Sequence, residues 1–134
     1  MRRRLLPVQS TQIETYRNVH KMTLIGRELE AAVLTKAAQK LIFCQNNWEA
    51  PNREENLKEA LRYNQQLWTV FQTELANPEN PLPKKLKEDL LSLSTFIDKR
   101  IFDIMSFPAP EKLDAIININ LNIAAGLSGS PARE

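Results

Sequence analysis

An amide in the middle of an apolar helical stripe is the feature that most constrains how this chain can fold. In a helix over Ala60–Phe71 and its flanks, residues three and four apart share one face. The apolar residues of that face are Leu57, Leu61, Trp68, Phe71 and Leu75. Asn64 lies in the middle of them. Because an unpaired buried amide costs about 1–3 kcal/mol, Asn64 must find a hydrogen-bond partner.

The same arrangement recurs near the C-terminus. There the apolar stripe consists of Leu113, Ile116, Ile117, Ala124 and Leu127. Asn120 lies at its centre. Two interpretations are open: Asn64 and Asn120 bond to each other between packed helices and fix their register, or they bond to the backbone of a partner. Both favour a helix-on-helix assembly over a catalytic cleft.

Clusters of proline and asparagine divide the chain into helices, because proline cannot continue a helix and asparagine favours turns. We therefore predict an all-α, single-domain bundle of four principal helices. These helices cover about 27–46, 53–76, 83–106 and 111–127. A short polar helix over 11–22 precedes them. Asn52 is expected to cap the second principal helix, with Glu55 three residues on completing a capping box.

The first and third principal helices also carry apolar stripes that are expected to face the core. In the first helix, the stripe consists of Leu29, Val33, Ala37, Leu41 and Cys44. In the third helix, it consists of Leu86, Leu90, Leu93, Ile97, Ile101 and Ile104. Four apolar stripes are enough to enclose one core between four helices.

One segment carries a competing signal. Ile117–Ile123 alternates apolar and polar residues, which by itself is typical of a strand. We predict helix there, because the flanking residues follow the helical period and no other segment resembles a strand partner.

The two ends of the chain are expected to lie outside the bundle domain, which spans 27–127. Residues 1–26 form a basic extension and 128–134 a disordered tail in this division. The formal net charge is +2, and Arg2, Arg3 and Arg4 supply three positive charges, so the remaining residues sum to −1. Direct nucleic-acid binding by the bundle is therefore not expected, and the arginine arm is the one basic element that could touch RNA.

Residues that could carry catalysis are sparse. Cys44 and His20 are the only cysteine and histidine, and they lie on different predicted helices. A lone cysteine is more often a packing residue than a nucleophile, so we expect no enzyme activity. The sequence has no glycine-rich phosphate loop and no metal-binding motif, so no cofactor or metal is expected. The single cysteine, with no signal peptide and no apolar membrane span in the sequence, favours the cytoplasm.

The aromatic pair Trp68 and Phe71 has two interpretations. Aromatic residues at helical spacing normally fill a core. They can also line a groove that accepts a partner helix, where such side chains dominate the affinity.

Three segments carry a family pattern in a fixed order. They are Ala60-Leu61-Arg62-Tyr63-Asn64-Gln65-Gln66-Leu67-Trp68, Asn80-Pro81-Leu82-Pro83 followed by Leu90 to Phe96, and Pro110-Glu111-Lys112-Leu113 followed by Ile119 to Leu127. These segments resemble the FlaF family of flagellar biosynthesis regulators, and Arg27–Ala31 is similar to that family's early helix. The resemblance covers about 27–127. The family usually carries Arg where this chain has Leu121, and the long N-terminal segment makes Met22 an alternative start.

The resemblance implies a small all-helical cytoplasmic protein of flagellated α-proteobacteria, required for flagellin production and export. Its implied partners are flagellin and an FlbT-type regulator. We therefore expect a module that binds flagellin much as a secretion chaperone does. The alternative is a regulator that acts on flagellin mRNA, directly or with an FlbT-type partner. The residues expected to bind or support a partner are Asn64, Trp68, Phe71, Leu93, Phe96 and Asn120.

Overall fold

Four α-helices and one short 3₁₀ helix make up residues 8–128, the part of the chain whose backbone this computed structural model describes; side chains are described from Gly26 onward. The helices are α1 (Val8–Asn46), α2 (Arg53–Ala76), α3 (Lys84–Ser106), η1 (Pro110–Leu113) and α4 (Asp114–Leu127). No strand occurs within this range, so the predicted all-α, single-domain fold is confirmed. The arginine arm at 2–4 and the expected tail beyond Ser128 lie outside the described residues.

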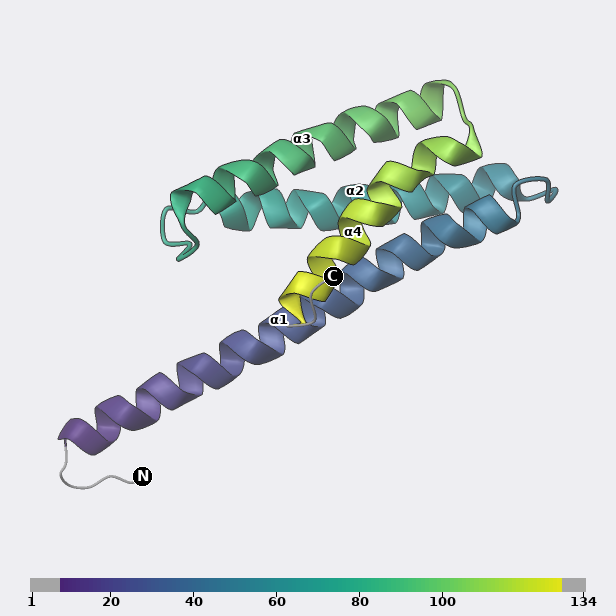
Figure 1. Ribbon diagram of the computed structural model, residues 1–134. Helices are drawn as coiled ribbons and strands as arrows, with labels where there is room; N and C mark the ends of the chain where they lie inside the picture. Colours follow the sequence, from purple (N-terminus) through teal and green to yellow (C-terminus); the bar gives the residue numbers. More distant parts are fainter. Residues whose placement is uncertain (1–7, 129–134) are drawn as a thin grey trace.

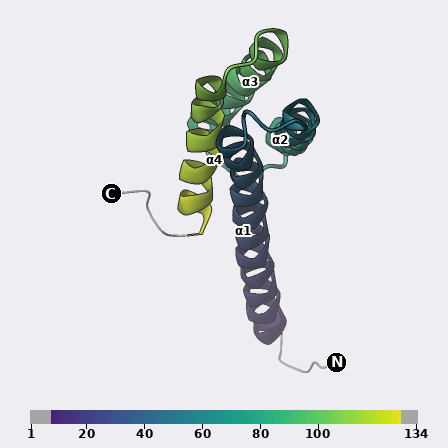
Figure 2. The ribbon, with the colours of Figure 1, turned by 90° about the vertical axis from the view of Figure 1, so that its right-hand side faces the viewer.

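The helices pack around α1 in an uneven way (Figures 1 and 2). α4 packs alongside α1, and α2 packs against α1 on another side. α3 packs mainly against α2, on the side away from α1. The N-terminal part of α1 extends past the other helices, so the bundle encloses only the C-terminal part of this helix (Figure 1).

α1 differs from the sequence prediction because it is continuous. We expected a short helix over 11–22 and a separate one from about Arg27, whereas a single helix of 39 residues runs from Val8 to Asn46. The chain has no proline between these ends, and Gly26 lowers helix stability by only about 1 kcal/mol. One glycine is not enough to break the helix.

The core lies where α1, α2, η1 and α4 meet the C-terminal half of α3. Its largest fully buried apolar side chains are Trp68, Leu34, Leu41, Leu61, Ile97, Ile104, Leu113 and Ile116. The segment with the strand-like alternation, Ile117–Ile123, is helical within α4, as predicted. Its buried members, Ile117 and Asn120, are three residues apart, which fits the helical period.

Two residues of the predicted stripes are exposed instead of buried. Leu29 is 64% exposed and Leu86 43% exposed. On α1 the core face is formed by Ala31, Leu34, Ala37, Ala38, Leu41 and Cys44. Small alanines let neighbouring helices approach closely, and their spacing is as helical as that of Leu29 and Val33, so periodicity alone could not choose between the two faces. Leu86 is exposed because it lies in the first turn of α3, whereas the buried residues of this helix begin only at Ser94.

The predicted cap of α2 is only partly present. Asn52 occupies the N-cap position, but its side chain makes no capping bond. Its backbone carbonyl accepts a hydrogen bond from the N–H of Asn56 at 3.0 Å. Glu54 and Glu55 lie in the first turn, where their charges favour the positive end of the helix dipole.

Candidate partner-binding groove

The two amides of the apolar stripes meet inside the bundle. Asn64 and Asn120 are both completely buried. Nδ2 of Asn120 donates a hydrogen bond to Oδ1 of Asn64 at 2.6 Å. The interpretation in which the two amides satisfy each other is therefore confirmed, and it ties α2 to α4.

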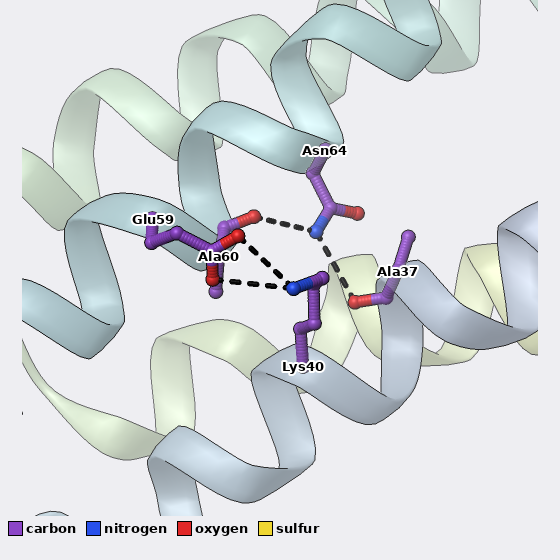
Figure 3. Close-up of polar contacts among 5 residues, drawn as sticks. All are labelled: Ala37, Lys40, Glu59, Ala60 and Asn64. Carbon is purple, nitrogen blue, oxygen red and sulfur yellow. Dashed lines mark hydrogen bonds and ion pairs between the residues drawn. The ribbon is translucent and has the colours of Figure 1, made fainter.

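The network continues to the backbones of α1 and α2. Nδ2 of Asn64 donates to the carbonyl oxygen of Ala60 at 2.9 Å and to that of Ala37, on α1, at 3.2 Å (Figure 3). One amide thus joins three helices. The neighbouring ion pair between Lys40 and Glu59, 3.0 Å long, also links α1 to α2. It contributes little, since exposed ion pairs are worth about 0–1 kcal/mol.

Trp68 forms the other end of the network. Its indole Nε1 donates to Oδ1 of Asn120 at 2.9 Å. Its ring meets that of Phe71 edge to face, with centroids 5.5 Å apart. A buried tryptophan with a bonded N–H and a packed ring has a fixed orientation. The amides therefore hold Trp68 in position.

A groove of about 330 Å³ lies above Trp68, at the end of the bundle where α1 leaves it. It is bordered by α1, the C-terminal parts of α2 and α4, the connector between α2 and α3, and the first half of α3. Its apolar lining consists of Trp68, Phe71, Leu75, Pro81, Leu82, Leu90, Ile123 and Leu127. Its polar lining consists of Arg27, Glu30, Glu74 and Asn80. An apolar groove with a few polar groups at its edge is typical of a binding site.

Glu30 is the titratable group of the groove that its surroundings perturb most clearly. Its side chain is half-buried, and this burial raises the pKa above its ordinary value of 4.5. The negative charge of Glu74 raises the pKa further, whereas the positive charge of Arg27 lowers it. The groove thus holds two carboxylates that repel each other.

Glu30→Gln is expected to raise the melting temperature at pH 7. The pKa of Glu30 is higher in the folded than in the unfolded chain, so ionising this carboxyl destabilises the fold once the pH exceeds the folded-state pKa. Below about pH 4 the carboxyl is protonated in both states, and the difference from the variant should vanish. Thermal melts followed by circular dichroism at pH 7 and pH 3.5 measure this. Glu28→Gln, at an exposed position of the same helix, is the control. A lower melting temperature for Glu30→Gln at pH 7 would contradict the assignment.

The six residues expected to bind or support a partner occupy three different positions relative to the groove. Trp68 and Phe71 line the groove. Asn64 and Asn120 lie beneath it, buried, with their side-chain oxygens already bonded. Leu93 packs against the core, and the exposed Phe96 lies under the guanidinium of Arg100, 5.2 Å from its ring centroid. Neither belongs to the groove lining.

Sequence reasoning missed the acidic pair and the connector residues of the groove. Glu30 and Glu74 are far apart in sequence and lie on two separate helices, so no spacing connects them. Leu82 lies between prolines in the connector, where no period marks its direction. Leu75 and Leu127 are the last residues of the two apolar stripes that contain Asn64 and Asn120, and both line the groove. Their places at the ends of these stripes are the one sequence feature that indicates a shared site.

Cys44 is a packing residue. Its side chain is buried in the core, and burial, followed by the charge of Glu59, raises the pKa of the thiol, while Lys40 lowers it. A thiol in this setting stays protonated and is a poor nucleophile. Across the described residues, no three His, Cys, Asp or Glu side chains come together in a way that could hold a metal ion.

Comparison with protein families identifies the family of this chain. The family model of the flagellar protein FlaF matches residues 12–127. The chain belongs to the FlaF family. The matched range includes every residue of the amide–tryptophan network and of the groove. The match also begins upstream of Met22, so it includes residues 12–26 of the expected N-terminal extension.

The other comparisons add no relative of this FlaF chain. No curated protein and no solved structure gives a match. None of the helices in the described part of the chain combines the length and the apolar character that a membrane crossing requires. Leu121 is partly exposed on α4 and does not line the groove.

Proposed function

We propose that this FlaF protein binds unassembled flagellin in the cytoplasm, as a secretion chaperone does, and thereby promotes flagellin synthesis and export. The observation that carries this proposal is the apolar groove above Trp68 in a chain of a flagellar family. Flagellin ends form amphipathic helices that need cover before export, and a groove of this kind accepts the apolar face of such a helix. The role is one of binding, without catalysis.

The buried network supports the proposal because it gives the groove a rigid floor. Trp68 is held by Asn120, which is held by Asn64, which is bonded to α1. A preorganised apolar surface binds more tightly than one that must be ordered on binding. The amides thus serve binding without touching the partner.

The proposal is tested by filling the groove without disturbing the fold. Gly26 lines the groove, and a Cβ atom added at this residue would meet nothing within 4 Å. Gly26→Leu should therefore keep the fold, occupy the groove and weaken flagellin binding by about 10- to 100-fold, the equivalent of one apolar anchor side chain. The measurement is the affinity of the purified chain for flagellin monomers by calorimetry.

Gly126→Leu is the matched control. A Cβ atom at Gly126 also meets nothing within 4 Å, and this residue lies on α4 outside the groove lining. Both changes favour helix to a similar degree. Equal affinities of the two variants for flagellin would contradict the proposed site, and no affinity of the wild-type chain would contradict the proposed function.

Salt dependence distinguishes flagellin binding from direct action on flagellin mRNA. If the three arginines of the arm contacted RNA phosphates, affinity would fall about 20- to 40-fold between 50 and 200 mM salt. Flagellin binding in an apolar groove should change far less. Deletion of Arg2 to Arg4 should leave it nearly unaltered. If that deletion abolishes flagellin binding, or if flagellin leader RNA binds and flagellin does not, the mRNA-linked function replaces the proposed one. Adding an FlbT-type protein to both titrations shows whether such a partner alters either affinity.

A further inference from the structure

The acidic pair beside the apolar groove indicates which kind of segment the groove selects. We propose that the groove takes an amphipathic helix that carries one Lys or Arg at the edge of its apolar face, and that this basic residue pairs with Glu30 and Glu74. The identification of this helix as part of flagellin rests on the proposed function. The chemistry of the bound segment rests on the groove itself.

The charged residues of the groove favour binding of a positively charged group. Glu30 from α1 and Glu74 from α2 line it together with a single basic residue, Arg27. Among the side chains that the structure describes, none of Lys, Arg or His comes within 4.0 Å of either carboxylate. The groove therefore carries a net charge of −1 at neutral pH, and its two carboxylates repel each other with incomplete compensation. A basic group from a partner would relieve this repulsion.

The apolar lining of the groove indicates that the other contacts of the bound segment are apolar. Aromatic and aliphatic side chains from α2, α3 and α4 face one opening, and the glycine at its α1 edge leaves that edge clear. A volume of about 330 Å³ is at the small end of binding pockets. It suits a few anchor side chains at positions i, i+3 or i+4, and i+7 of a docked helix. A helix with these anchors and an adjacent Lys or Arg matches both properties of the groove.

The test compares three synthetic amphipathic helical peptides that share one apolar face. They differ in a single flanking residue, which is Lys, Gln or Glu. Trp48→Phe leaves Trp68, in the floor of the groove, as the only tryptophan of the full-length chain, so its fluorescence reports occupancy. The Lys peptide should bind about 3- to 10-fold more tightly than the Gln peptide, and the Glu peptide should bind most weakly.

The decisive variant is Glu30→Gln combined with Glu74→Gln. It should reduce the preference for the Lys peptide to less than about twofold. Removing mutually repelling charges does not destabilise the fold, so a loss of preference cannot be ascribed to unfolding, and a thermal melt verifies this. Glu28→Gln combined with Glu79→Gln makes the same change of charge at exposed positions outside the groove, and it should keep the preference.

Each outcome decides between distinct statements. Equal affinities for the three peptides, or no binding of any of them, would overturn this inference. Binding of flagellin without any loss in the Glu30→Gln, Glu74→Gln chain would also overturn it and leave the proposed function standing. A Lys preference without flagellin binding would support the inference and refute the proposed function. A dimer in light scattering that dissociates in the double variant would show that a second copy of the chain occupies the groove, which refutes the partner proposed here.

Discussion

Asn120→Leu lowers the free energy of unfolding by about 2–6 kcal/mol in this account. The leucine removes the acceptor of the Trp68 indole N–H and the donor to Oδ1 of Asn64. Both groups then stay buried without a partner, and each costs about 1–3 kcal/mol. The loss is a large part of the stability of a domain this size, which is typically 5–15 kcal/mol. Urea unfolding followed by circular dichroism measures it.

Asn122→Leu is the control for this prediction. Asn122 lies two residues further along α4 and is exposed, so its replacement should change stability by less than about 0.5 kcal/mol. The double variant Asn64→Leu, Asn120→Leu should lose less free energy of unfolding than the sum of the losses of its two single changes. Each single change leaves the other amide without its partner, whereas the double change removes both amides. If Asn120→Leu and Asn122→Leu proved equally stable, the buried network would have no energetic importance.

Trp68→Ala is expected to lower the free energy of unfolding by about 3–5 kcal/mol, the usual cost of removing a core tryptophan. Trp68 is only 1% exposed, so the alanine would leave a cavity beneath the groove. It would also leave Oδ1 of Asn120 without the indole N–H that bonds to it. Denaturant unfolding gives the magnitude. Flagellin binding should weaken even at temperatures where the variant is still folded, because the floor of the groove is gone.

Trp68→Phe separates the two roles of the tryptophan. It keeps an aromatic ring in the floor but removes the indole N–H, so its cost should be closer to the 1–3 kcal/mol of an unpaired acceptor. Circular dichroism distinguishes lost folding from lost binding in both variants. A Trp68→Ala chain with wild-type stability and wild-type flagellin affinity would show that the ring supports neither.

Some features could be predicted from sequence because physical chemistry leaves few alternatives. An amide at the centre of an apolar stripe has to be paired, and a bond between Asn64 and Asn120 is one of the two interpretations that the stripes leave open; the structure shows this bond. Prolines at 78, 81 and 83 excluded a helix, and the end of α2 and the start of α3 follow from them. These constraints are local or concern a single pair of residues.

Other features depend on tertiary packing and had no sequence signal of their own. Leu29 and Ala31 both fit a helical stripe, and only the close approach of α4 to α1 decides that the alanine faces inward. Glu30 and Glu74 line the same groove because the turn between α1 and α2 reverses the chain and brings the C-terminal part of α2 back beside the middle of α1. No sequence pattern links the two residues to each other, so the acidic edge of the groove could not be found before the helices were assembled.

Photo-crosslinking from the groove tests the central claim most directly. A benzophenone side chain at position 82, in the lining, should crosslink to flagellin in the full-length chain. The same group at Phe96, which was expected to bind a partner but lies outside the groove, and at the exposed Phe102 should give little product. Crosslinks from position 82 that disappear in the Gly26→Leu variant are the predicted result. Crosslinks from 96 or 102 with none from 82 would contradict the account.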